Sequence, residues 1–130
     1  MTVIPSSELS FVQLPGRRSA DPLTGIGTGS SLRVVDLDAA ERRQAHVHPH
    51  TEEIIYVARG SGEIWVDGRW QRFGAGDVVR VPTGEAHAGF ADPGTETRLV
   101  CFFPHPDLAG NYEETNREVS RSERPTKETG

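Results

Sequence analysis

The chain of 130 residues has a single cysteine, Cys101, so no intramolecular disulfide can form. Cys101 lies in the apolar run 99–103, which predicts a small buried side chain in a strand. The sequence also has no run of about 18 apolar residues, the length that a membrane-spanning helix needs. It shows no basic segment followed by an apolar one near its start, so we expect a cytoplasmic protein without a membrane partner.

Positive charge is scarce as well. The sequence has 14 Lys and Arg against 19 Asp and Glu, which gives a formal net charge of −5. Its Arg17-Arg18 and Arg42-Arg43 pairs are isolated, and we interpret them as solvated surface residues. A nucleic-acid-binding face needs clustered basic side chains. We therefore expect no nucleic-acid partner.

Short apolar segments, separated by Gly, Pro and Asp, occupy the middle of the sequence. The expected strands are 32–37, 44–48, 53–58, 63–66, 70–73, 78–81, 87–90 and 97–103. Asp67-Gly68 between two of them is a strong signal for a tight hairpin, with Trp65 and Trp70 paired across it. Because no amphipathic helix interrupts these strands, we predict an all-β, single-domain antiparallel β-barrel or sandwich.

The two ends differ from this middle region in composition. Residues 1–30 are rich in Ser, Gly and Pro, and we expect an N-terminal extension with one edge or swapped strand near 9–14. Residues 31–108 form the expected barrel. Residues 109–130 are polar, with five acids and four bases after position 110. Such a segment buries too little apolar surface to offset its ordering entropy, so we expect a disordered or loosely docked tail.

Three histidines and a glutamate are spaced like the ligands of a metal. His46 and His48 are two apart in an expected strand, so their side chains share a face. Glu53 begins the next strand, and His87 follows a later turn. Imidazole and carboxylate suit one divalent transition metal per chain, whose identity (Fe, Mn, Ni, Co, Cu or Zn) these residues leave open. Glu52 is an alternative carboxylate, whereas His50 and His105 are expected in loops.

The spacing of these residues resembles that of the cupin superfamily. Its first motif is matched by His46, His48, Glu53 and Gly60. Its second motif is matched by Gly76, Pro82, Gly84 and His87. Fifteen residues (61–75) separate the two motifs, a short spacing that resembles small single-domain members.

This resemblance implies a cupin barrel of the jelly-roll type, with His46, His48, Glu53 and His87 as the metal ligands. The six residues between Glu53 and Gly60 favour Glu53 over Glu52. Two positions depart from the motifs, where Ala40 and Ala91 replace the family's glycine and asparagine. The family does not use either position as a ligand.

The resemblance further implies a metal-dependent enzyme that acts on an oxygen-rich small molecule, as a dioxygenase or other oxidoreductase, isomerase, cyclase or lyase. Tyr56 and Arg33 are the first candidates for an acid/base or carboxylate-orienting role. The alternative is a binding or sensing module with the same metal pocket and no turnover. A homodimer, paired through an N-terminal strand and a sheet edge, is the expected assembly.

Overall fold

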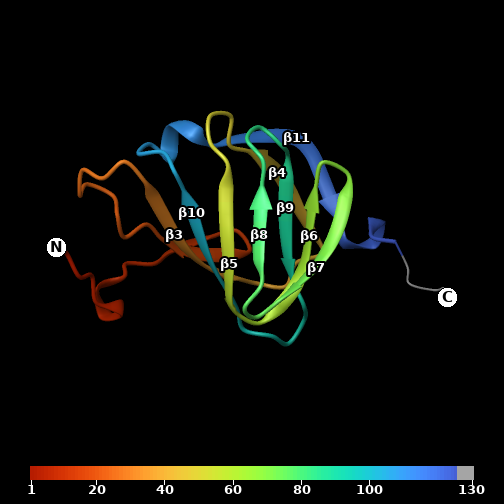
Figure 1. Ribbon diagram of the computed structural model, residues 1–130. Helices are drawn as coiled ribbons and strands as arrows, with labels where there is room; N and C mark the ends of the chain where they lie inside the picture. The colour runs from red at the N-terminus through yellow and green to blue at the C-terminus, as the bar shows by residue number, and fades with distance from the viewer. Residues whose placement is uncertain (126–130) are drawn as a thin grey trace.

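The computed structural model describes residues 1–125, which form two facing antiparallel sheets (Figure 1). The six-stranded sheet contains, in spatial order, β1 (Val12–Leu14), β2 (Arg17–Ala20), β3 (Ser31–Leu37), β10 (Thr97–Phe103), β5 (Glu53–Arg59) and β8 (Val78–Val81). The five-stranded sheet contains β11 (Glu113–Ser120), β4 (Arg42–Val47), β9 (His87–Ala91), β6 (Ser61–Val66) and β7 (Arg69–Gly74). Three short 3₁₀ helices are η1 (Ser6–Glu8), η2 (Ala109–Asn111) and η3 (Arg121–Glu123).

The all-β prediction is confirmed, but the two sheets are not closed into a barrel. Closure would require ladders between the edge strands of the two sheets, which are β1 and β8 in one sheet and β11 and β7 in the other. No such ladder joins the sheets over residues 1–125. Within the described residues the architecture is therefore an open sandwich of two sheets.

The turn chemistry at Asp67-Gly68 has the predicted effect. Asp67 and Gly68 adopt φ values of 48° and 93°, the left-handed conformation that a tight hairpin turn requires. Strands β6 and β7 pair around this turn, with Trp65 directly opposite Trp70.

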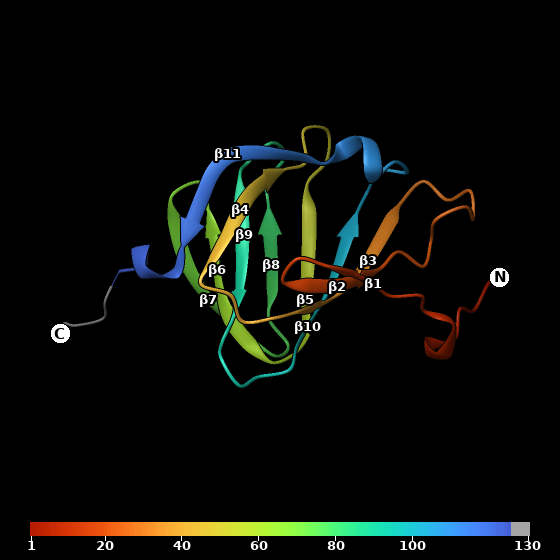
Figure 2. The same ribbon diagram turned by 180° about the vertical axis from the view of Figure 1, so that it is seen from behind.

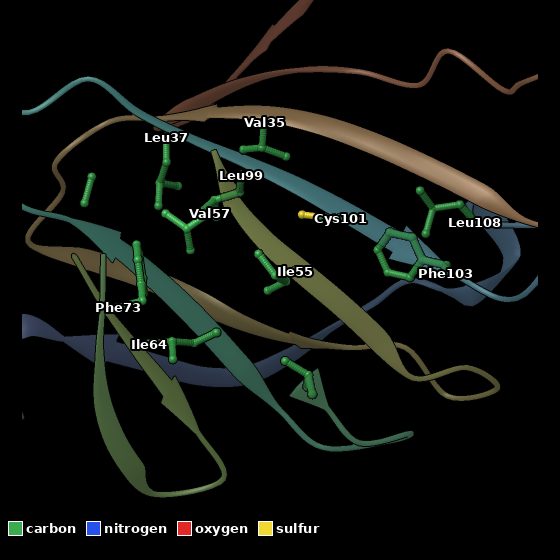
Figure 3. Close-up of a cluster of buried hydrophobic side chains, with 12 residues drawn as sticks. Val35, Leu37, Ile55, Val57, Ile64, Phe73, Leu99, Cys101, Phe103 and Leu108 are labelled. Carbon is green, nitrogen blue, oxygen red and sulfur yellow. The ribbon is translucent and has the colours of Figure 1, made fainter. Parts of the chain in front are cut away.

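The main hydrophobic core lies between the sheets and includes Cys101, which is buried as predicted (Figure 3). Its largest fully buried side chains include Phe103 and Val57. A second, smaller cluster covers the outer face of the five-stranded sheet, because Ala88 and Phe90 alternate with the inward-facing His87 on β9. The outer face of the five-stranded sheet is therefore partly apolar.

The N-terminal extension forms a hairpin of two strands rather than the single strand expected. Strand β1 pairs with β2, and β2 pairs with β3 of the same chain. Figure 2 shows this hairpin from behind, lying over the region between β4 and the six-stranded sheet. Its tip, Leu14 to Arg17, becomes part of the wall of a cavity.

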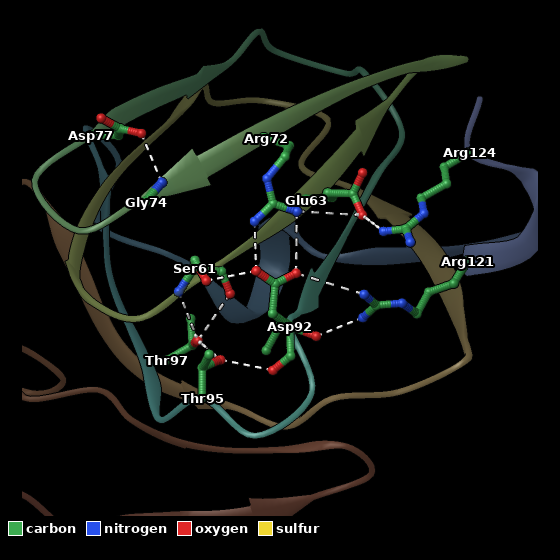
Figure 4. A network of polar contacts seen from close by, with 11 residues as sticks. Ser61, Glu63, Arg72, Gly74, Asp77, Asp92, Thr95, Thr97, Arg121 and Arg124 are labelled. Atoms are coloured by element: carbon green, nitrogen blue, oxygen red, sulfur yellow. Dashed lines mark hydrogen bonds and ion pairs between the residues drawn. The ribbon is translucent and has the colours of Figure 1, made fainter. Parts of the chain in front are cut away.

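For residues 113–120 the prediction of a disordered tail is wrong, because they form β11 along the edge of β4. Backbone pairing with β4 supplies hydrogen bonds that composition does not measure, and the single apolar residue Val119 is fully buried. Arg121 and Arg124 continue the attachment through ion pairs with Asp92 and Glu63 (Figure 4). The remainder of the predicted tail, residues 126–130, lies outside the described residues. Over residues 1–125, no helix is both long and apolar enough to cross a membrane.

Candidate metal centre

The four predicted ligands come from three strands of the two sheets. His46 lies in β4 and His48 directly follows that strand, so alternation gives both the same face. The turn after His48 returns the chain into β5, which begins at Glu53 in the facing sheet. His87 begins β9 and pairs with His46 across the ladder.

These four side chains meet at one point. Their ligand atoms all lie within 4.8 Å of one another, and His48, Glu53 and His87 are buried. The Nε2 atom of His87 is 3.0 Å from Oε1 of Glu53, and Nε2 of His48 is 3.3 Å from the same oxygen. A three-histidine, one-glutamate group that can hold a metal is therefore present.

Backbone carbonyls determine which nitrogen each imidazole presents to the centre. The Nδ1 atom of His48 lies 2.7 Å from the carbonyl oxygen of Asn111, and Nδ1 of His87 lies 3.0 Å from that of Glu85. A carbonyl only accepts hydrogen bonds, so in both rings Nδ1 carries the proton and donates it. The Nε2 atom of each ring then faces the Glu53 carboxylate, and it presents a lone pair there when the ring is neutral.

This arrangement fits a bound cation. Two lone pairs and a carboxylate oxygen, about 3 Å apart in a buried site, repel each other unless a proton or a metal lies between them. The Nε2 atom of His48 is buried and has no hydrogen-bond partner. Neutral imidazoles with a carboxylate are the donor set that divalent transition metals prefer. The residues at the centre therefore fit such a metal.

Burial and mutual charge set the protonation of the group. Burial, followed by the charge of His87, lowers the pKa of His46 to about 2. Burial alone would raise the pKa of Glu53. The close contacts with His48 and His87 outweigh burial and hold that pKa below its usual range. For His87 too, burial is opposed by Glu53, whose hydrogen bond and charge raise the pKa of that ring. Glu53 is thus ionised, which is the form in which a carboxylate can bind a cation.

The centre faces a cavity of about 510 Å³ between the sheets. Val35, Ile55 and Leu99 supply apolar parts of its wall. Cys101 lines the cavity as well, and burial together with the charge of Glu53 raises its pKa well above the usual value. Its thiol therefore stays protonated and is not a fifth anionic ligand.

The two other candidate residues, Tyr56 and Arg33, differ in their position relative to the cavity. Tyr56 is 50% exposed on the outer face of β5 and is not among the residues that line the cavity, so its position does not support an acid/base role there. Alternation on β5 explains this, because Glu53 and Ile55 face inward and Tyr56 faces outward. Arg33 does line the cavity, where its Nε atom pairs with Asp21 at 2.8 Å.

The three remaining polar candidates, Glu52, His50 and His105, form interactions outside the candidate metal centre. Glu52, the alternative carboxylate, forms an ion pair of 2.7 Å with Arg80. The backbone N–H of His50 donates to the side chain of Asn111, and Nδ1 of His105 accepts from the N–H of Asp107. The structure places none of these three side chains in the cluster of four.

Sequence reasoning missed Asn111 and Tyr112, which lie in the segment predicted to be disordered. Asn111 is almost fully buried and holds His48 by its carbonyl and the 49–51 turn by its side chain. The ring of Tyr112 stacks on His46, with centroids 4.8 Å apart and planes 24° from parallel. An amide and an aromatic residue at the start of an otherwise charged segment were the available signal.

Residues 33–103 match the model of the cupin domain family, which covers more than half of the chain. Together with the two-sheet fold and the three-histidine, one-glutamate group, this match shows that the chain belongs to the cupin family.

One curated relative and two solved structures illustrate the similarity. Protein SchB of Streptomyces halstedii is 30% identical over 91 residues, which cover 67% of this chain and 66%, just under two thirds, of SchB. The Streptomyces protein Pac13, described as a nucleoside dehydratase, superposes with a TM-score of 0.73 at 18% identity, covering 97% of this chain and 99% of Pac13. The polyketide cyclase RemF of Streptomyces resistomycificus has a TM-score of 0.69 at 21% identity, with coverages of 93% and 85%. The two structural similarities establish the fold.

Proposed function

We propose that this chain is a metal-dependent enzyme that acts on an oxygen-rich small molecule inside the cavity between its sheets. One observation carries the proposal: the Nε2 atoms of His48 and His87 converge on the buried Glu53 carboxylate, at 3.3 and 3.0 Å, where this group lines that cavity. A purely structural metal site would be closed by protein, whereas this group opens onto about 510 Å³ of space.

In the proposed site His46, His48, Glu53 and His87 hold the metal, which supplies Lewis acidity toward the oxygens of the substrate. Asn111 and Glu85 orient two of these ligands through their carbonyl groups. The apolar walls exclude bulk water, so the ionised and polar groups act in a low-dielectric space. The ring of Tyr112 stacks on His46 and lines the same cavity.

The reaction class includes dioxygenase, isomerase, cyclase and lyase chemistry. The descriptions of Pac13 as a dehydratase and RemF as a cyclase support elimination or cyclisation on this fold. We therefore favour a reaction in which the substrate is polarised at an oxygen and no dioxygen is consumed.

The test begins with the metal content of purified protein, which should be close to one transition metal per chain. Fe, Mn, Ni and Zn forms are then incubated with chelating substrates (a 1,2-diketone, a catechol and a flavonol), in air and under argon. We expect at least one substrate to change, equally in both atmospheres, and His87→Ala to abolish the change. Conversion only in air would replace our preferred class with a dioxygenase. Tight binding with every substrate recovered unchanged in all four forms would instead identify a non-catalytic binding module.

A further inference from the structure

The cavity is basic although the whole chain is acidic. Apart from Glu53 at the candidate metal centre, four arginines and a single acid, Glu114, line it, whereas the chain carries a net charge of −5. Charge of one sign in a cleft with low-dielectric walls focuses the field and attracts ligands of the opposite sign. The distribution of these arginines therefore bears on which molecules enter.

Two of the four arginines, Arg33 and Arg43, already have hydrogen-bond partners within the chain. Arg33 is paired with Asp21 through both Nε and a terminal nitrogen, at 2.8 and 3.1 Å. Arg43 donates from one terminal nitrogen to the carbonyl groups of Gly16 and Asp38, at 2.9 and 2.7 Å, and its guanidinium lies over Phe90 on the outer side of the sheet. Arg43 thus attaches the N-terminal hairpin to β4, and Arg33 is neutralised.

The other two arginines, Arg17 and Arg42, have no carboxylate partner in the part of the chain that the structure describes. Arg17 stands opposite Leu37, an inward-facing core residue, so register directs Arg17 toward the cavity.

Arg42 approaches the same cavity from the facing sheet. It lies four residues before His46 on β4, so it shares the face of that ligand at a separation of about 13 Å along the strand. Arg17 and Arg42 therefore flank the cavity from opposite sheets, away from the metal centre. Guanidinium groups without a protein carboxylate are well suited to bind a carboxylate of a ligand.

We propose that the cavity takes an organic acid, with its carboxylate at Arg17 and Arg42, its apolar body along the inner walls and its other oxygens at the His46–His48–Glu53–His87 centre. The apolar walls formed by Val35, Ile55 and Leu99 lie between the two polar ends and require a carbon-rich body. This inference rests on the proposed function, since it names the class of molecule that the same site accepts.

Calorimetric titration with 4-phenylbutyrate and with its neutral amide tests the carboxylate subsite, because the two probes differ in charge and hardly in shape. In about 50 mM salt, where screening is weak, we expect the acid to bind about tenfold more tightly than the amide. Arg17→Gln and Arg42→Gln should each remove most of this preference without changing the affinity for the amide. Arg17→Lys should keep part of it.

Arg18→Gln is the matched control, since Arg18 neighbours Arg17 on β2 but pairs with Asp36 and does not line the cavity. It removes the same charge and should leave both affinities within about twofold, because an exposed and distant charge contributes little. Equal affinities for acid and amide, or an equal loss in Arg18→Gln and Arg17→Gln, would overturn the carboxylate subsite. Metal content and turnover are unaffected by that outcome, so a failure of this inference is distinguishable from a failure of the proposed function.

Discussion

Glu52 and Glu53 are neighbours with the same side chain, yet strand alternation gives them opposite environments. Glu53 is buried against two imidazoles, whereas Glu52 is paired with Arg80 at the surface. An ionised carboxylate inside the centre attracts a metal far more strongly than one in solvent. The geometry therefore separates a ligand from a solvated acid at adjacent positions.

Glu53→Gln should accordingly weaken metal binding by more than about tenfold, because the amide keeps the shape and removes the charge. Glu52→Gln should leave metal binding unchanged. Equilibrium dialysis against Zn²⁺, followed by metal analysis, measures both. The ligand assignment fails if Glu52→Gln empties the site while Glu53→Gln retains its metal.

Asn111 holds two neighbouring points beside the centre, since its carbonyl accepts from His48 and its side chain accepts from the N–H of His50 at 2.6 Å. Asn111→Ala keeps the carbonyl but removes the side-chain bonds to the His50 N–H and the Asp107 carbonyl, and it leaves the part-buried N–H of His50 without its partner. We expect a loss of about 1–3 kcal/mol in the free energy of unfolding, measured by urea denaturation. Asn116→Ala, at an exposed position of β11, is the control and should change stability by less than about 0.5 kcal/mol.

At the scale of elements, β11 is the strand whose contribution composition most underestimates. It covers the edge of β4, and Val119 closes the outer cluster around Phe90. We expect a chain that ends at Tyr112 to melt at least about 10 °C below a chain that ends at residue 125, because it exposes both the edge and the cluster. Differential scanning calorimetry compares the two, and equal melting temperatures would show that β11 is dispensable.

The sequence allowed the central strands to be predicted nearly to their ends, because alternation and turn residues act locally. The hairpin at Asp67-Gly68 and the strand 97–103 are examples. The same reasoning missed β2 and β11, two polar strands whose stability comes from backbone bonds to partners elsewhere in the chain. Local patterns carry no information about such partners.

The candidate site shows the same division. Residue types and spacing were sufficient to group His46, His48, Glu53 and His87, because the chemistry of a ligand is a property of the side chain. Residue types and spacing did not show on which face of β5 the Tyr56 side chain lies. Alternation divides the residues of a strand between two faces, but it does not say which face is buried. Tyr112 escaped notice because its partner, His46, lies 66 positions earlier in the chain.

At the scale of the whole molecule, the centre connects the two sheets. Glu53 belongs to the six-stranded sheet, whereas His46 and His87 belong to the five-stranded one. A metal that binds the folded chain alone stabilises it by about 2.7 kcal/mol at a free concentration 100 times its Kd. We therefore expect Zn²⁺ to raise the melting temperature and EDTA to reverse the change. A His46→Ala/His87→Ala double variant should show no response, and a rise as large as in the wild type would place the metal elsewhere.

The homodimer expected from the sequence remains a prediction, and the outer face of the six-stranded sheet offers a place for it. Tyr56, Val78 and Phe102 are exposed there by 50%, 66% and 39%, and Tyr56 pairs directly with Val78. Neighbouring exposed apolar side chains favour burial against a partner. Sedimentation equilibrium should report a dimer that Val78→Lys weakens. A monomeric wild type would remove the prediction.

The contacts of Asn111 and Tyr112 with the metal centre also set an order of events during protein synthesis. All four candidate ligands, the last being His87, leave the ribosome before Asn111 does. A nascent chain therefore displays its histidines before it contains the carbonyl that selects the tautomer of His48, or the strand that covers the edge of β4. The complete candidate centre exists only once translation has passed Tyr112, so we expect a metal to bind after the fold is complete instead of templating it.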